Sequence, residues 1–571
     1  MKQLRWQIVI VVLALAAIAV LVLTQQAEQP PQVTNGPEII GPQPVVGGVY
    51  TEALIGEPGR LNPVLDFYNP VDRDVNRLIY SSLVQFEADG LPETDLAESW
   101  GISQDGTVYN FSLKTDAVWH DGEPVTSEDV VFTVELLRSD ALPVPDDLRQ
   151  FWINVEVSAL DTHLVQFRLP EPFAPFLDYV TFGILPFHLL GEIDVDALPE
   201  ADFNLEPVGS GPYRFDGWLV DGGEISGVIL TAFEDFYDDR AFIDQFIFRY
   251  YDSAAEALAA YEADEVMGLS QVPQDVLADA LEEPDLNLYT SRLPKITMVL
   301  LNLDRQSAPY FQELEVRRAL LMSVNRQRLI DLLLMGQGIL ADTPIFPGTW
   351  AHYEGIDRTD FNPEAAESLL RNAGYTFPAE GGPTRQREQV PLSFTMLHPD
   401  DPFMALVAQY IQQSWARVGV SVQLEPVDYE NLVDDRLVTG NYEAALVDLS
   451  LFRSPDPDPY PFWHQTQIGT GQNYSRWDDR SASEYLEQAR LTDNLVERIR
   501  LYRNFQVLFN RELPALLLYY PVYTYGVDAQ VEGLTLGPLY DLSDRLAGAP
   551  TWFLLEGGPT LAPTPTQAPE E

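Results

Sequence analysis

The chain is predicted to fold as a mixed α/β protein with more than one domain, and three observations lead to this class. Its 571 residues exceed what one hydrophobic core accommodates, so two or three domains are expected. Residues 107–119 alternate apolar and polar side chains with a period of two, which is typical of a half-buried strand. In the C-terminal half, segments with helical spacing alternate with segments typical of strands, which favours sheets packed against helices.

The individual elements follow from local patterns. Strands are predicted at 49–54, 107–119, 420–429 and 442–451. Helices are predicted at 253–264, 315–336, 362–375, 402–419 and 495–512. Several of these helices end at glycine, a common stop signal. Ser253 and Glu256 have the spacing of a capping box at the start of the first helix. Arg317 and Arg318 are expected on an exposed helix face.

The segment 119–133, "WHDGEPVTSEDVVFT", combines one histidine with four carboxylates and therefore raises the question of a metal or acid–base site. Local structure explains most of these groups. Asp121-Gly122 is a tight-turn dipeptide, Thr126 is a natural helix N-cap, and Asp129 is placed to bond back to it. His120 has no second histidine at metal-ligand spacing. A turn followed by a helix start is therefore predicted.

Composition excludes several classes of function. The net charge of −53 would repel a phosphate backbone, so no nucleic-acid partner is expected. The chain has no cysteine, which removes disulfides, thiol catalysis and thiolate metal sites. No catalytic triad, nucleophile elbow or metal motif is recognised, so neither an enzyme nor a cofactor is predicted. An exported hydrolase using two carboxylates is the competing class, since 87 acids always supply some pair.

The two ends of the chain are predicted to lie outside the folded body. Lys2 and Arg5 precede an apolar run at residues 8–23, so residues 1–24 form either a signal peptide or a membrane anchor. A retained anchor is favoured because no convincing cleavage site follows. Residues 25–48 are a Pro/Gly-rich linker, and residues 557–571 are a similar tail. The body is therefore expected to be extracytoplasmic, at the cell surface or in the periplasm.

Several motifs resemble the family 5 extracellular solute-binding proteins, which are the peptide-, nickel- and oligosaccharide-binding components of ABC importers. These motifs are "GEPGRLNPVLDFYNP" from Gly56, "LAESWGISQDGTVYNFSLKTDAVWHDGEPVTSEDVVFT" from Leu96, "PVGSGPYRFDGW" from Pro207, "LNLDRQSAPYFQELEVRRAL" from Leu301 and "FNPEAAESLLRNAGY" from Phe361. Their order and spacing are more specific than any one of them. Gly209, Gly211 and Pro212 are also expected to fix a turn.

The resemblance implies a periplasmic-binding-protein-like fold of the large peptide-binding (type II) subclass. Two lobes joined by a hinge close on the ligand, and an extra domain is added. The implied boundaries are 49–82, 168–292 and 519–556 for lobe I, 83–167 for the extra domain and 293–518 for lobe II. The implied function is to deliver a peptide or similar solute to an ABC permease. An oligosaccharide ligand, a nickel complex and a membrane-tethered ligand sensor are the alternatives.

The family's peptide binders hold the α-ammonium with an acidic residue just after a tryptophan, and this pattern is altered here. Phe452 falls at the tryptophan position and Pro455 at the acidic position. Asp456 or Asp458 would take over the role after a small loop shift. The alternative is a rigid proline-rich turn with solvated acids.

Six aromatic or amide side chains match ligand-facing positions of the family. They are Tyr68, Asn69, Phe151, Trp152, Tyr523 and Tyr525. Aromatic residues at such positions also suit the core, and both interpretations stay open for them.

Overall fold

The computed structural model describes residues 44–304, 306, 308–452 and 454–555. The predicted N-terminal anchor and most of the linker lie outside these residues, as does the tail. Within the described ranges, no helix has the length and apolar character needed to cross a membrane.

Within the described residues, twelve strands form one mixed sheet in the order β18-β17-β19-β13-β20-β11-β1-β10-β9-β8, and β12 and β14 pair with β20. The strands of its first half are β1 (Val49–Ile55), β8 (Tyr213–Asp221), β9 (Glu224–Ala232), β10 (Gln245–Tyr251), β11 (Gly268–Leu269) and β12 (Leu286–Arg292). The strands of its second half are β13 (Lys295–Leu301), β14 (Gly338–Leu340), β17 (Ser393–Pro399), β18 (Ser421–Val427) and β19 (Ala444–Ser450).

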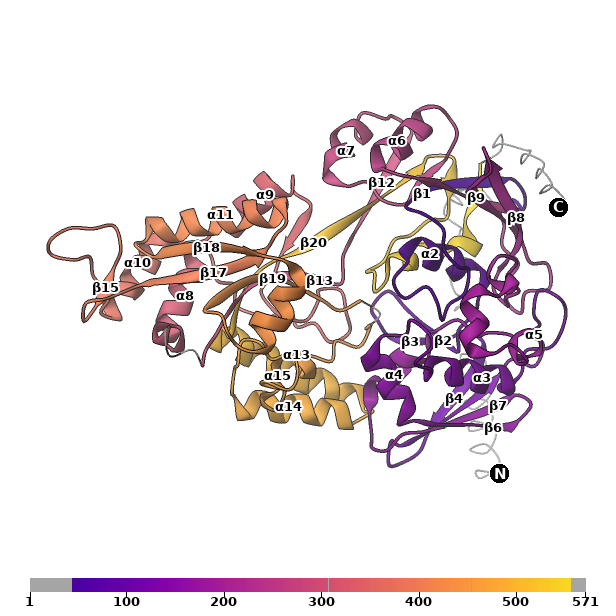
Figure 1. Ribbon diagram of the computed structural model, residues 1–571, viewed down its shortest axis with the longest axis horizontal. Helices are drawn as coiled ribbons and strands as arrows, with labels where there is room; N and C mark the ends of the chain where they lie inside the picture. The colour runs from indigo at the N-terminus through magenta and orange to yellow at the C-terminus, as the bar shows by residue number, and fades with distance from the viewer. Residues whose placement is uncertain (1–43, 305, 307, 453, 556–571) are drawn as a thin grey trace, which may run out of the picture. The chain divides into compact units, whose positions relative to one another are not determined.

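Strand β20 (Ala515–Asp528) joins the two lobes of the fold. Its first residues pair with β13, whereas its last seven pair with β12. The change of partner falls at Pro521, which has no N–H for a ladder. We call the part around β1, β8–β12 and the end of β20 lobe I, and the part around β13, β14, β17–β19 and the start of β20 lobe II. Figure 1 shows β20 running from one into the other.

Lobe I carries a second, smaller sheet in the order β4-β5-β7-β6. Its strands are β4 (Ala97–Ile102), β5 (Val108–Leu113), β6 (Glu156–Asp161) and β7 (Leu164–Arg168), and the helices beside it are α3 (Ser127–Leu137) and α4 (Asp146–Ile153). The other elements of lobe I include β2 (Val84–Phe86), β3 (Pro92–Thr94), α2 (Pro70–Ile79), α5 (Phe187–Leu190), α6 (Ala254–Glu262) and α7 (Gln274–Ala280). One hydrophobic cluster extends from Tyr50 in β1 to Trp152 in α4, so the small sheet shares its core with the lobe.

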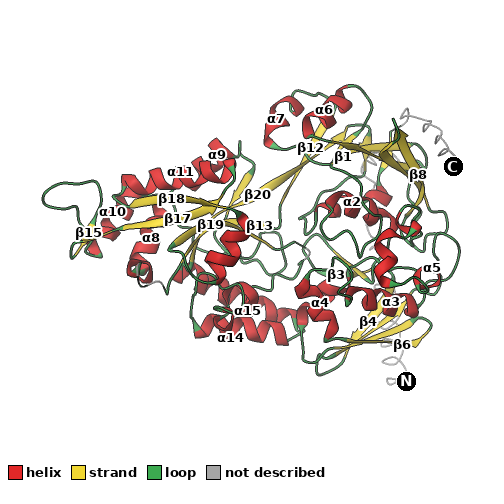
Figure 2. Cartoon of the chain, viewed as in Figure 1, coloured by secondary structure: helices red, strands yellow, loops and turns green. Residues whose placement is uncertain are grey.

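Lobe II is a sheet covered by helices on both faces, as the helices on either side of it in Figure 2 show. The helices are α8 (Leu314–Met322), α9 (Arg326–Leu333), α10 (Pro363–Asn372), α11 (Pro402–Arg417), α12 (Tyr429–Asn431), α13 (Tyr460–Trp463), α14 (Arg480–Leu491) and α15 (Leu495–Glu512). Side chains of β13 point alternately to the two faces of the sheet and so contribute to both hydrophobic cores. Val299 packs with the α8, α10 and α11 side, and Met298 packs with the α14 and α15 side.

One predicted helix is wrong in extent. Residues 315–336 form two helices, because α8 ends at Ser323 and Asn325 caps α9 by accepting the Arg328 N–H at 2.9 Å. Arg317 was predicted on an exposed helix face, and the structure buries it instead. Only 6% of its surface is accessible, and it donates to the carbonyls of Phe311 and Glu512. A guanidinium that satisfies carbonyl groups at a helix end is tolerated inside because its donors are used.

The segment 119–133 is a turn followed by a helix start, as predicted. Gly122 has a φ of 91°, in the region that favours glycine. Helix α3 begins directly after Thr126, whose N–H donates to Asp129 Oδ2 at 2.7 Å. Two of the four carboxylates, Asp121 and Asp129, therefore have structural hydrogen-bond partners.

His120 fixes the turn that contains Gly209 and Gly211, so two of the sequence motifs meet in space. Its Nδ1 accepts the Gly209 N–H at 3.1 Å, and its Nε2 donates to the Gly211 carbonyl at 3.0 Å. Burial lowers the pKa of His120 to about 4, so the ring is neutral at neutral pH. A Cβ at Gly209 would lie 2.0 Å from the Ile79 carbonyl oxygen, which explains why glycine stands there.

A buried ionic network ties the C-terminal segment to lobe I. Arg545 donates to Glu52 at 2.7 Å and to Asp74 at 2.7 Å. The other oxygen of Glu52 accepts the hydroxyls of Tyr50 at 3.0 Å and Tyr525 at 2.5 Å. Side-chain exposure is 1% for Arg545 and 0% for Glu52, so solvent does not screen these charges.

Candidate functional site

A cavity of about 470 Å³ lies in lobe II on the α14 and α15 face of the sheet. Its floor is made by Met298 of β13 and by Val447 and Leu449 of β19. Its walls are the helical segment 429–438 on one side and the segments 462–463 and 472–475 on the other. The volume is within the usual range for sites that bind small molecules.

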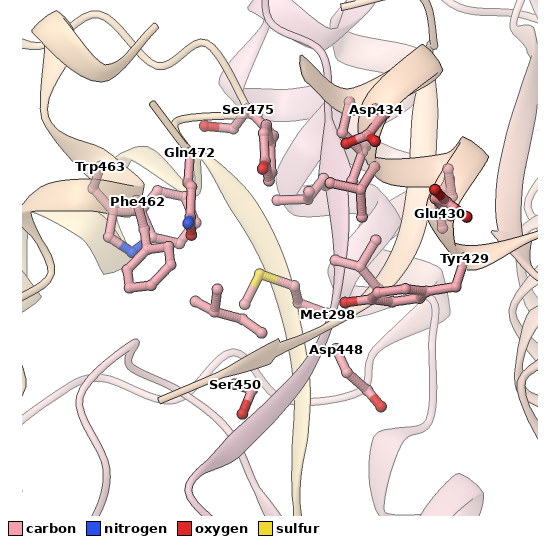
Figure 3. A pocket seen from close by; sticks show the side chains of 17 residues that line it. Met298, Tyr429, Glu430, Asp434, Asp448, Ser450, Phe462, Trp463, Gln472 and Ser475 are labelled. Carbon is pink, nitrogen blue, oxygen red and sulfur yellow. The ribbon is translucent and has the colours of Figure 1, made fainter. Parts of the chain in front are cut away.

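Aromatic side chains surround this cavity. Tyr429, Phe462, Trp463 and Tyr474 belong to its lining. Figure 3 shows Met298 near the centre, with Phe462 and Trp463 to one side and the Tyr429 ring to the other. Tyr429 is 62% exposed, whereas Trp463 is 2% exposed, so the cavity runs from an open mouth to a closed apolar wall.

The charged groups of the lining are all acidic. They are Glu430 and Asp434, one turn apart on the same helical segment, and Asp448 at the end of β19. Asp448 is neutralised by Lys295 at 2.5 Å and also accepts the Thr297 hydroxyl, and Figure 3 shows it pointing away from the cavity. Within the described ranges, neither Glu430 nor Asp434 makes an ion pair. The mouth of the cavity is therefore negative.

The loop after β19 is rich in acids, and two arginines bind them. Asp456 and Arg498 form an ion pair at 2.5 Å with both side chains 7% exposed. Asp458 receives Nε and Nη2 of Arg490, the shorter contact being 2.6 Å. The rigid-turn alternative expected solvated acids, and the structure instead pairs both loop acids with arginines. A clamp role for either acid stays a prediction, and it requires a ligand ammonium to share a carboxylate with an arginine.

Asp178 from lobe I joins this group, although it was not among the site residues predicted from the sequence. Its Oδ2 accepts the Asp456 N–H at 3.0 Å across 278 residues of chain. Burial raises the pKa of Asp178 well above its ordinary value, and the Asp456 carboxylate raises it further. Of the residues described here, three carboxyl groups (Asp178, Asp456 and Asp458) face the guanidinium groups of Arg490 and Arg498 where the lobes meet.

Three of the predicted ligand-facing residues have accessible side chains or cap an element. Tyr68 is 73% exposed and Phe452 is 40% exposed. Asn69 caps α2 by accepting the Val71 N–H at 3.0 Å, so it has a structural role whatever else it contacts. Their ligand contacts stay predictions.

The core alternative describes the other four positions. Trp152 and Tyr525 are 0% exposed, and Tyr523 is 6% exposed with its hydroxyl bonded to the Ser270 carbonyl. Phe151 stacks on Tyr179 with ring centroids 3.9 Å apart. Trp152, Tyr523 and Tyr525 are therefore buried, whereas Phe151 is half-buried, and ligand contact by any of the four stays a prediction.

Metal ligation is not supported by side-chain clustering. Within the residues that the structure describes, no group of three or more histidine, aspartate and glutamate side chains is arranged to hold an ion. The site is therefore described by its cavity and its acid–arginine cluster.

Known proteins share this architecture. The family model "Bacterial extracellular solute-binding proteins, family 5 Middle" matches residues 92–472, more than half of the chain. The dipeptide-binding protein of Escherichia coli (strain K12) is 26% identical over 524 residues, covering 87% of this chain and 94% of that protein.

Two solved structures have the same fold. AppA from Bacillus subtilis with a nonapeptide has a TM-score of 0.65 and 24% identity, covering 90% of this chain and 100% of AppA. NikZ from Campylobacter jejuni with Ni(L-His) has a TM-score of 0.65 and 23% identity, covering 88% and 99%.

Proposed function

Because the chain belongs to family 5 of the bacterial extracellular solute-binding proteins, we propose that it is the extracytoplasmic peptide-binding component of an ABC importer. It binds a peptide between its two lobes, and the bound form is presented to the membrane permease. Ligand binding of this kind shifts a population towards the state in which both lobes contact the ligand. The protein then acts by binding rather than by catalysis.

The observation that carries the peptide assignment is the surplus of carboxylates where the lobes meet. Among the described residues of this cluster, Asp178, Asp456 and Asp458 exceed Arg490 and Arg498 by one negative charge once Asp178 is ionised. A peptide's α-ammonium supplies the missing positive charge, and a sugar does not. A nearby cation would also lower the raised pKa of Asp178 and favour its charged form. We propose that Asp456 or Asp458 contacts the ammonium with help from Asp178.

The remaining parts of the chain fit the same function. We propose that Tyr68 and Phe452, which are exposed, contact the peptide. The proposed lobe boundary at 292/293 falls between the end of β12 at Arg292 and the start of β13 at Lys295. The proposed boundary at 518/519 lies within β20, before its change of partner. We propose that residues 1–24 hold the body at the membrane, supported by Lys2 and Arg5 before the apolar run.

Thermal unfolding of the full chain with separate pools of short peptides, oligosaccharides and nickel–histidine tests this function. A peptide at 100-fold above its Kd adds about 2.7 kcal/mol to the free energy of unfolding, which is an easily seen upward shift. We expect the shift with peptides alone. A shift with sugars or nickel–histidine alone would replace the peptide assignment.

A further inference from the structure

The cavity in lobe II has a composition that selects one chemical class of group. Its lining contains the four aromatic rings of Tyr429, Phe462, Trp463 and Tyr474, and among the residues that the structure describes no lysine, arginine or histidine belongs to it. Its apolar floor favours a hydrocarbon chain. Aromatic faces carry negative charge density and attract cations within about 6 Å of the ring centre. The lining therefore suits an apolar group that ends in a positive charge.

The mouth of the cavity adds full negative charges to the aromatic rings. Glu430 and Asp434 stand four residues apart and so lie on one side of the helical segment 429–438. Like charges at this spacing oppose each other and weaken the helix when no cation is near. Within the described residues no arginine or lysine pairs with either of them. Lys295, at the start of β13, is bound to Asp448.

We propose that this cavity is a side-chain pocket that selects a basic residue, lysine or arginine, of the bound peptide. The aliphatic stem lies on Met298 and Leu449, and the charged end lies at the mouth beside the Tyr429 ring, Glu430 and Asp434. This selection rests on the proposed peptide-binding function. It assigns a specificity to the cavity that lies beyond peptide binding itself.

The position of the cavity in the lobe agrees with this role. Ser450 belongs to the lining, and the loop with Phe452, Asp456 and Asp458 follows directly in the chain. We therefore infer that a peptide whose ammonium meets the loop acids places a side chain in this cavity. The long flexible stem of lysine or arginine is suited to span that interval.

Matched tripeptides test the selection by calorimetric titration of the full chain. The peptides are alanine tripeptides in which one position carries lysine, norleucine or glutamate, giving three sets of three. Norleucine keeps the straight apolar stem and lacks the charge. We expect lysine to bind about tenfold more tightly than norleucine at one position, equivalent to about 1.4 kcal/mol, and glutamate to bind most weakly. Added salt should reduce the preference because the acids are exposed.

Two variants connect the preference to the cavity. The double variant Glu430→Gln with Asp434→Asn should reduce the lysine preference to about threefold or less and leave norleucine binding unchanged. Asp435→Asn, an exposed acid next to Asp434 that does not line the cavity, is the matched control and should keep the full preference. All three substituted carboxylates are exposed, so folding should be unaffected.

The outcomes separate the two proposals. If peptides bind but lysine and norleucine differ by less than threefold at every position, the selection is overturned and peptide binding stands. If the double variant keeps the full lysine preference, the cavity is not its source and the assignment is wrong. If no peptide of any set binds, the proposed function itself fails, and the selection fails with it.

Discussion

Replacing Arg545 by methionine should lower the free energy of unfolding by about 3–5 kcal/mol. The guanidinium is 1% exposed and is the shared counter-ion of Glu52 and Asp74. Its removal leaves two carboxylates in a low-dielectric environment without compensation, and that penalty exceeds the loss of the hydrogen bonds. Chemical denaturation of the full chain, followed by fluorescence, measures the effect.

Neutralising the whole network should restore most of this loss. The triple variant Arg545→Met, Glu52→Gln and Asp74→Asn removes the unpaired charges and keeps similar volumes, so its stability should approach that of the original protein. Arg511→Met is the matched control, since Arg511 is 66% exposed and pairs with its neighbour Glu512 at the surface. It should change stability by less than about 1 kcal/mol. An Arg545→Met variant as stable as this control would contradict the structural role of the network.

Replacing Arg498 by methionine should destabilise the protein by a similar amount, about 3–5 kcal/mol at neutral pH. Arg498 is 7% exposed, pairs with Asp456 at 2.5 Å, and lowers the pKa of the nearby Asp178. Without it, Asp178 and Asp456 repel each other where the lobes meet. Arg500→Met, on the same helix but exposed and paired with Glu497, should have little effect.

The loss caused by Arg498→Met should depend on pH in a definite direction. Burial and the Asp456 carboxylate already raise the pKa of Asp178 in the folded protein, so the folded state binds a proton more readily than the unfolded state. Such a group favours folding below its unfolded pKa and loses this contribution as pH rises through its folded pKa. The difference between Arg498→Met and the original protein should therefore be smaller at pH 4.5 than at pH 7. A larger difference at pH 4.5 would contradict the assigned cluster.

The sequence predicted the elements whose signals are local. Residues 495–512 form a helix over the predicted range, because helical spacing and the Asn494 cap agree. The single helix predicted over residues 315–336 was too long. The residues on both sides of Asn325 favour helix, so the sequence pattern hides the break at this cap. Local patterns do not report whether a guanidinium such as Arg317 folds inward, because the Glu512 carbonyl that receives two of its N–H groups comes from a distant part of the chain.

The site was predictable only in part for the same reason. The loop with Asp456 and Asp458 was found through its resemblance to a family motif. The arginines that pair with it come from α14 and α15, and Asp178 comes from the other lobe. From the sequence alone, aromatic residues such as Trp152 and Tyr525 look the same whether they face a ligand or the core. Only packing separates these roles.

The central claim is that a peptide binds between lobes that are continuous through β20, and one distance measurement tests it most directly. The chain has no cysteine, so two introduced cysteines carry spin labels without competition. Leu160→Cys in lobe I and Leu406→Cys in lobe II are 51% exposed sites, and Leu406→Cys with Val507→Cys is a control pair within lobe II. The peptide pool should shift and narrow the distance distribution of the first pair and leave the control pair unchanged. Peptide binding without any change in the first pair, or no effect of peptide at all, would contradict the claim.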